Sequence, residues 1–205
     1  NNKLSSILLG KEFNTIDLFD QFLIEFDATE NKSNLGANSI LALSLAFAKS
    51  LSDKNKKPFF EFLSKDNNFL LPVPMMNIIN GGSHADNNLD IQEFMIAPVG
   101  AKNFSEALRY GSEIFYSLKS ILKSNNLNTN VGDEGGFAPN IESVNKVIET
   151  IIQAIESAGL KIGKDILLSL DVASTEFYEN NYYHLKGENK KLSSDEMISY
   201  LKKLV

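Results

Sequence analysis

A histidine and a carboxylate accompany a glycine-rich turn in residues 80–94, which read NGGSHADNNLDIQEF. The paired glycines allow a backbone to approach a ligand closely, and His84 lies in the loop that they open, here called the histidine loop (residues 81–90). Glu93 falls on a predicted strand, on the face that it shares with Ile91 and Met95. A carboxylate on an apolar face is costly when unpaired, so Glu93 requires a partner, a metal ion or a catalytic task. The competing interpretation, an edge-strand glutamate exposed to water, has equal weight from spacing alone.

Two adjacent acids lie between glycines in residues 131–139, which read VGDEGGFAP and are here called the acidic loop. No cation accompanies Asp133 and Glu134 within this run. Adjacent carboxylates repel each other, and such repulsion is one way in which a site keeps a carboxylic acid protonated near neutral pH. A simple acidic glycine turn is the commoner explanation for this run taken alone. Together with the histidine loop, Glu134 becomes a candidate general acid.

Asp171 directly follows the apolar run of residues 166–170, so it lies at the C-terminal end of a predicted strand. Barrel enzymes place metal ligands and catalytic groups at this end of their strands. A turn-forming or helix-capping aspartate is an equally weighted alternative from position alone. Because the sequence has no cysteine and carboxylates predominate, a metal ion bound here is expected to be hard, which favours Mg²⁺ over Zn²⁺. The other histidine, His184, lies in a tyrosine-rich strand and is expected to be structural.

The elements that must position these residues follow from hydrophobic periodicity. Helices are predicted over residues 15–26, 37–51 and 58–63, and the second is expected to be largely buried. Buried strands are predicted over residues 71–80, 91–98 and 166–170, with helices over 103–123 and 142–158 before the third strand. The last part is predicted to hold a hairpin over residues 177–185, a solvated loop over 188–191 and a helix that begins at the capping box of 193–196.

The order strand, strand, helix, helix, strand predicts an α/β fold, the beginning of an α/β barrel that helices of another domain precede. We expect a boundary near residue 70, which separates a mostly helical part in residues 1–70 from the first part of the barrel in residues 71–205. A complete eightfold barrel takes about 250 residues. Residues 71–205 are too few for one, so we expect a smaller fold or a truncated barrel.

Composition excludes several classes of protein. The chain has 26 acidic and 20 basic residues, a single arginine (Arg109) and a formal net charge of −6, so nucleic acid is not its expected partner. The absence of cysteine excludes disulfides and thiol nucleophiles and fits a reducing compartment, the cytoplasm. Neither a signal peptide nor a membrane span is recognisable, so we expect a soluble protein. The chain begins without methionine and ends without a polar tail, so we expect both ends to be cuts.

These segments, in this order and spacing, are similar to the signatures of the enolase family. The similarity includes residues 31–38 (NKSNLGAN), 71–80, 97–101 (APVGA) and 169–177 (SLDVASTEF), and extends over essentially the whole chain. The wording ADNN at residues 85–88 resembles the bacterial members. The resemblance implies an N-terminal α+β capping domain followed by a barrel with an unusual ββαα beginning, in agreement with the element order.

The resemblance further implies a magnesium-dependent lyase that interconverts 2-phosphoglycerate and phosphoenolpyruvate. Carried over by motif, Glu134 is the acid that assists departure of the C3 hydroxyl, and Glu93 supports it by polarising the acid network. His84 and Gln92, together with Glu93, form the substrate contacts, and Asp171 is the first carboxylate ligand of the structural Mg²⁺. The base in such enzymes is a lysine or histidine, and metal charge on the developing dianion is expected to be the main electrostatic contribution.

Other parts of the family's site have no counterpart in this sequence. In the family, two further magnesium ligands, the lysine base and the phosphate-binding arginine and serine come from later barrel strands, and a mobile loop comes from before residue 1. We therefore expect the 205-residue chain alone to lack useful turnover and to leave a sheet edge open. The complete protein is expected to be a cytoplasmic homo-oligomer, a dimer or an assembly of dimers, with cell-surface display as an additional location.

Two other functions compete with this interpretation. A different acid dehydratase of the same superfamily would keep the barrel and one Mg²⁺ but change the substrate contacts, and the histidine loop and the acidic loop argue against it. A non-catalytic surface-binding protein or scaffold on the same fold would not need the candidate acids, which are unaltered here. Replacement of the lysine base in a longer sequence would be the sign of that second alternative.

Overall fold

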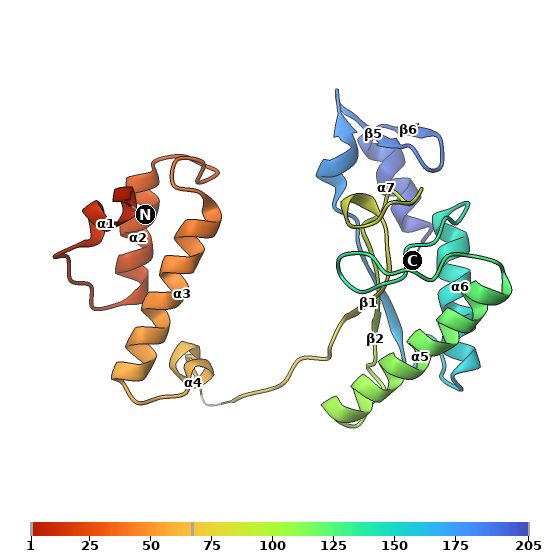
Figure 1. Ribbon diagram of the computed structural model, residues 1–205, viewed down its shortest axis with the longest axis horizontal. Coiled ribbons are helices and arrows are strands. Elements are labelled where there is room, and N and C mark those ends of the chain that lie inside the picture. Colours follow the sequence, from red (N-terminus) through yellow and green to blue (C-terminus); the bar gives the residue numbers. More distant parts are fainter. Residues whose placement is uncertain (1, 67, 205) are drawn as a thin grey trace. The chain divides into compact units, whose positions relative to one another are not determined.

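The computed structural model describes residues 2–66 and 68–204. The chain divides into two compact units, Asn1–Leu70 and Leu71–Val205, which are described separately here (Figure 1). Within the described residues, none of the helices combines the length and apolar character that a membrane crossing requires. The residues that the sequence predicts for the site all lie in the second unit.

Unit 1 is helical, with α1 (Asn2–Leu8), α2 (Ile16–Asp27), α3 (Ala37–Lys54) and α4 (Phe59–Leu63). The helices predicted over residues 15–26, 37–51 and 58–63 are confirmed, whereas α1 was not anticipated. Thr15 caps α2, because its Oγ1 accepts a hydrogen bond from the backbone N–H of Leu18 at 3.3 Å. The core of the unit joins α2 to α3, and the rings of Phe19 and Phe47 stack with centroids 4.4 Å apart.

The prediction that α3 is largely buried is wrong. Leu41 and Leu45 are 59% and 50% exposed, and only Ile40, Ala48 and Ser52 of this helix are buried. The reason is that α2 is the principal partner of α3 within unit 1 and packs on one face of it. A nearly continuous apolar run therefore does not show how many faces of a helix are covered.

A buried carboxylate organises the turn between α2 and α3. Asp27 is fully buried and accepts hydrogen bonds from the backbone N–H groups of Thr29 (3.2 Å) and Leu35 (2.6 Å), and from the hydroxyl of Thr29. Burial alone would raise the pKa of Asp27, but hydrogen bonds from Thr29, Leu35 and Asn34 outweigh it and hold the pKa below its ordinary value. The carboxylate thus satisfies a backbone N–H group near each end of this turn.

Unit 2 contains a sheet of three strands in the order β1 (Met76–Asn80), β2 (Glu93–Ala97) and β3 (Leu167–Asp171), with both neighbouring pairs antiparallel. The predicted strands are confirmed in existence, but β1 is shorter than the predicted residues 71–80. Pro72 and Pro74 fall in the missing part, and proline cannot donate a hydrogen bond to a sheet. A bulge between Asn77 and Ile79 interrupts the register of β1 with β2.

Helices α5 (Phe104–Ser124) and α6 (Val144–Ser157) cover one face of this sheet (Figure 1). Their N-caps are Asn103 and Ser143, so the predicted helices are confirmed to within two residues. Along β2, Phe94 and Ile96 point into the core beneath the helices, whereas Glu93 and Met95 lie on the opposite, half-buried face. The strand alternation therefore directs Glu93 away from the hydrophobic core.

The third strand is less buried than the sequence suggests. Ile166 is fully buried just before β3, but Leu167 is 45% exposed and the other residues of β3 are half-buried. Among the described residues, β3 pairs with β2 alone and borders the sheet. The description of β3 as a buried strand is therefore wrong for this chain.

A small second sheet follows β3. After a short 3₁₀ turn (Ser174–Phe177), it consists of β4 (Tyr178–Glu179), β5 (Tyr182–Leu185) and β6 (Lys190–Leu192), and α7 (Ser194–Lys202) comes next. The predicted hairpin is confirmed, but the predicted loop over residues 188–191 is wrong, since part of it pairs as β6. The capping box of Ser193 and Glu196 is confirmed. His184 lies on β5, with its Nε2 3.3 Å from the carbonyl oxygen of Glu179.

Candidate active site

Three polar residues form one row across the end of the three-stranded sheet. Glu93, the first residue of β2, is paired with Asn80 of β1 on one side and with Asp171 of β3 on the other. Because β1 and β3 both run antiparallel to β2, their C-terminal ends lie beside the start of β2. Like charges directly opposite each other destabilise a sheet. The stability of the sheet therefore does not explain why Glu93 and Asp171 are paired. Glu93 is on the central strand, which excludes the interpretation as an exposed edge-strand glutamate.

The acidic loop lies against the outer edge of β1. The backbone N–H of Asn80 donates to the carbonyl of Phe137, and the N–H of Phe137 donates to Ile78, both at 2.9 Å. Two glycines permit this approach. A Cβ on Gly136 would lie 2.6 Å from Oδ1 of Asn80, and a Cβ on Gly132 would lie 2.5 Å from the carbonyl oxygen of His84. The glycines of the run DEGG therefore place Glu134 close to the end of β1.

Two asparagines hold the Glu134 carboxylate from the same side. The side-chain amides of Asn77 and Asn80 donate to Oε2 of Glu134 at 3.1 and 3.2 Å. The other oxygen, Oε1, lies 3.6 Å from Nε2 of His84, and the Glu134 side chain is 33% exposed. Glu134 is thus accessible to a small molecule and fixed at one oxygen.

The asparagines were not among the residues predicted for the site. Both lie on a strand whose other central residues, Ile78 and Ile79, are buried and apolar. Asn80 is completely buried, so its polar side chain replaces what would otherwise be a packed hydrophobic group. Polar residues inside an apolar strand were the available sequence signal, and the pattern MNIIN carries it twice.

The pKa of Glu93 is raised above its ordinary value. Burial raises the pKa of Glu93 first, a hydrogen bond with the carboxyl of Glu134 raises it further, and the negative charges of Glu134 and Asp171 act in the same direction. The proximity of His84 offsets part of this effect. Glu93 therefore favours its protonated form more than an isolated glutamate does.

The histidine loop returns on itself next to this pair. The N–H of Gly81 donates to the carbonyl of Gln92 at 2.8 Å, and the N–H of Gly82 donates to Leu89 at 2.7 Å. His84 ends a short 3₁₀ turn (Gly82–His84), and its carbonyl accepts the N–H of Asp133 at 3.1 Å, which joins the two loops. The structure thus brings His84, Glu93, Glu134 and Asp171 to one end of the sheet.

Gln92 takes a different place from the acids. Its side-chain Oε1 accepts a hydrogen bond of 3.4 Å from the hydroxyl of Ser83 in the histidine loop. Gln92 directly precedes Glu93, and successive side chains of an extended backbone point to opposite faces of the sheet. Its nearest polar partner is therefore the loop, and no described contact joins it to Glu134.

The chemistry of the site fits a hard cation in part. Asp171 is half-buried, its Oδ1 accepts the N–H of Ala173 at 3.0 Å, and its charge adds to the negative potential at Glu93. Mg²⁺ is bound by one or two carboxylates together with water and substrate oxygens, so Asp171 could serve as one such ligand. Among the described residues, however, no three histidine, aspartate or glutamate side chains gather as a metal-binding group.

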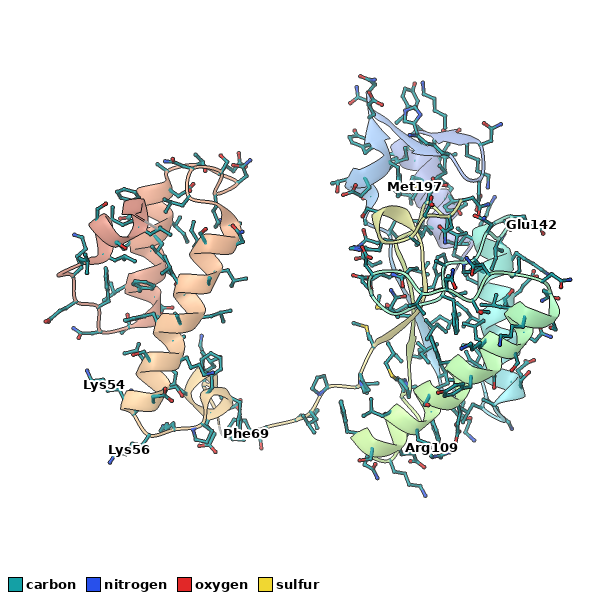
Figure 2. The ribbon with its side chains drawn as sticks, in the orientation of Figure 1. Lys54, Lys56, Phe69, Arg109, Glu142 and Met197 are labelled. Atoms are coloured by element: carbon teal, nitrogen blue, oxygen red, sulfur yellow. The ribbon has the colours of Figure 1, made fainter. Side chains whose placement is uncertain are left out.

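The single arginine does not contribute to this cluster. Figure 2 shows Arg109 on α5 at the opposite end of unit 2 from Met197 of α7 and the small second sheet. Arg109 instead pairs with Glu113, with 2.6 Å between Nη1 and Oε1. Phosphate recognition by a guanidinium is therefore not provided by Arg109.

Two protein-family models match the chain. Residues 1–63 match the family model described as enolase, N-terminal domain, and residues 68–205 match the model described as enolase, C-terminal TIM barrel domain. The second match covers most of the chain and includes His84, Glu93, Glu134 and Asp171. The fold class is accordingly α/β, with helices of the enolase N-terminal domain followed by the ββαα and third strand of the enolase barrel. The chain belongs to the enolase family.

Proposed function

We propose that this chain supplies the acid side of an enolase reaction, the reversible dehydration of 2-phosphoglycerate to phosphoenolpyruvate. The observation that carries the proposal is the placement of Glu134, which is held by two amide donors, adjoins a second carboxyl and remains partly exposed. The motif wording ADNN further suggests the bacterial type, and the cytoplasm is the proposed location. The reaction class follows from the family, whereas the identity of the substrate is part of the proposal.

Glu134 is suited to act as the general acid through one particular oxygen. Because Oε2 already accepts two N–H groups, the proton of the neutral acid would sit on Oε1. Oε1 is also the oxygen nearer to His84. In the proposed reaction, the C3–O bond breaks and Glu134 gives its proton to the departing hydroxyl, so water leaves and the carboxylate remains.

Glu93 would support this step by holding a proton of its own. Burial and then Glu134 raise the pKa of Glu93, which favours the protonated form of this carboxyl. After Glu134 has given up its proton, the neutral Glu93 carboxyl can donate a hydrogen bond to the new carboxylate. His84 and Gln92 line the adjacent loop and are the proposed substrate contacts.

The proposed cofactor is Mg²⁺, with Asp171 as one of its ligands. When bound, the metal would supply positive charge beside the carboxylate of the substrate as the hydrogen on C2 is removed. The family resemblance implies that the base for that hydrogen, a lysine, lies outside these 205 residues. We therefore propose that the chain alone has no useful turnover and that the complete enzyme is the appropriate protein for assay.

The decisive experiment separates the two halves of the reaction in the complete enzyme. The variant Glu134→Gln keeps the size of the side chain but has no acidic proton, so phosphoenolpyruvate formation should fall by about 10²- to 10⁴-fold. Exchange of the C2 hydrogen of 2-phosphoglycerate with deuterated solvent should continue, because it depends on the base. Glu149→Gln, the same change at an exposed glutamate of α6 that pairs with Lys146, is the matched control and should retain both activities.

Either of two results would overturn part of the proposal. Undiminished dehydration by Glu134→Gln would remove Glu134 from the acid role. Absence of any Mg²⁺-dependent turnover of 2-phosphoglycerate by the complete wild-type enzyme would reject the substrate itself.

A further inference from the structure

One aspartate connects the histidine loop to the second sheet. The turn between β5 and β6 presents two successive backbone N–H groups, and the Asp90 carboxylate accepts both of them. Oδ1 accepts the N–H of Lys186 and Oδ2 accepts the N–H of Gly187, each at 2.9 Å. A carboxylate that uses both oxygens on two neighbouring N–H groups fixes the orientation of the turn as well as its distance.

The turn also touches the backbone of the histidine loop directly. A Cβ on Gly187 would lie 1.7 Å from the carbonyl oxygen of Asn88 and 3.2 Å from Oδ2 of Asp90. No side chain can be accommodated at this position without movement of the turn. Gly187 therefore allows a close backbone approach that the two hydrogen bonds of Asp90 require.

Apolar packing does not replace these contacts. A cavity of about 340 Å³ lies between the histidine loop and the second sheet, and its lining includes Ser83, Glu176, Phe177 and His184. Loop and sheet are thus separated by open space over part of their facing surfaces. The hydrogen bonds of Asp90 and the close approach at Gly187 join the two directly.

Each partner is anchored independently on its far side. In the histidine loop, the Asn88 side chain donates to the carbonyl of Ile141 at 2.9 Å and accepts its N–H at 3.0 Å. In the turn, Oε1 of Glu188 accepts the N–H of Val144 and the hydroxyl of Tyr200, each at 2.9 Å. Asp90 is consequently a direct link between the histidine loop, which Asn88 fixes to Ile141, and the β5–β6 turn, which Glu188 fixes to α6 and α7.

We propose that Asp90 is a positioning residue for substrate binding, which acts through the histidine loop on His84. This inference rests on the proposed function in one respect, the contact of His84 with substrate. The histidine lies between Gly82, whose N–H donates to Leu89, and Asn87, whose side chain donates to Asn80 and Pro139. Loss of the Asp90 link removes the contact of this segment with the β5–β6 turn and should weaken substrate binding more than the chemical step.

The test compares three variants of the complete enzyme. Asp90→Asn places an amide N–H₂ against one of the two backbone N–H groups, so one hydrogen bond to a charged group is lost. The Michaelis constant for 2-phosphoglycerate should therefore rise about tenfold. The turnover number should change less than twofold. Gly187→Ala, which displaces the turn but leaves Asp90 unchanged, should have the same kinetic pattern. Tyr200→Phe removes a hydrogen bond of Glu188 at the far side of the turn and should lower thermal stability without a change in the Michaelis constant.

A readout independent of turnover separates this inference from the function on which it rests. The imidazole NMR signals of His84, assigned with His84→Asn, should shift or broaden in Asp90→Asn and remain unchanged in Tyr200→Phe. If these signals move but no variant or wild type dehydrates 2-phosphoglycerate, the proposed function fails and the positioning role of Asp90 stands. If Asp90→Asn and Tyr200→Phe lower stability alike and leave both His84 and the Michaelis constant unaltered, Asp90 is merely structural and the inference is wrong.

Discussion

Asn80 donates its side-chain amide to Oε2 of Glu134 across 3.2 Å, while its own amide oxygen is buried without a hydrogen-bond partner among the described residues. Asn77 has the same arrangement, with a donor distance of 3.1 Å. A buried acceptor without a partner costs roughly 1–3 kcal/mol. Strand β1 carries two such unpaired oxygens. Their cost is understandable if the two amides serve to orient the Glu134 carboxylate and not to stabilise the sheet.

The first prediction concerns Asn80. Replacing it with alanine leaves Glu134 with one amide donor, and dehydration by the complete enzyme should slow by about tenfold to a hundredfold, as expected for loss of a hydrogen bond to a charged group. Solvent exchange of the C2 hydrogen should change much less. Ile79→Val, a buried substitution on the same strand that costs about 0.5–1.5 kcal/mol, controls for stability and should leave dehydration intact. Equal losses of exchange and dehydration in Asn80→Ala would contradict the aiming role.

A second prediction contrasts two glycines of the acidic loop. Gly136→Ala places a Cβ 2.6 Å from Oδ1 of Asn80 and 2.9 Å from the backbone carbon of Ile78, so the loop must move away from β1. Gly135 has a φ of +84° but no atom within 4 Å of an added Cβ, so Gly135→Ala should cost only about 1–2 kcal/mol of backbone strain. Urea unfolding should therefore show the larger loss for Gly136→Ala, which should also lose dehydration. A smaller loss for Gly136→Ala than for Gly135→Ala would be inconsistent with the close contact.

The elements that carry the site could be predicted because their signals are local. The caps Asn103 and Ser143 and the amphipathic periods behind them define α5 and α6, and the glycine turns mark both loops. The alternation along β2 also separates Glu93 from the core-facing Phe94. Such signals depend on residues that are close in the sequence, which is why they survive without any tertiary information.

The features that could not be predicted depend on contacts between distant segments. The amides of Asn77 and Asn80 acquire a role only because the acidic loop pairs with the edge of β1, and Asp90 acquires one only because the β5–β6 turn meets its carboxylate. The prediction that α3 is largely buried was wrong for a similar reason. An apolar run shows which faces of a helix are hydrophobic, but not which of them pack against another element. The strand β6 was missed because Lys190 and Lys191 read as solvated, although an edge strand accommodates lysine well.

The third prediction concerns the pH dependence of unit 1. Burial opposes ionisation of Asp27, but its hydrogen bonds dominate and lower its folded-state pKa. A lowered carboxyl pKa contributes stability that is present above the ordinary aspartate pKa and is lost as the pH falls through the folded value. Asp27→Asn should therefore be less stable than wild type at neutral pH and should lose less stability on acidification. Thr29→Val, which removes one donor, should give an intermediate result in thermal melts across that range, and parallel pH profiles for all three proteins would refute the assignment.

The last prediction concerns the metal and uses binding instead of turnover. A ligand that binds only the folded protein raises its stability in proportion to the logarithm of ligand concentration over the dissociation constant. Added Mg²⁺ should thus raise the melting temperature of the complete enzyme, and a chelator should reverse the rise. Asp171→Asn should reduce this Mg²⁺-dependent increase, because an amide oxygen is a weaker ligand than a carboxylate and carries no charge.

Asp165, which precedes β3 and accepts the N–H of Lys161 at 2.9 Å, provides the control. Asp165→Asn should lower the melting temperature itself but keep the full response to Mg²⁺. If Asp171→Asn retains the wild-type response, Asp171 is not a ligand of the metal, and its place opposite Glu93 must serve the neighbouring carboxyl instead, because the charge of Asp171 helps to raise the pKa of Glu93.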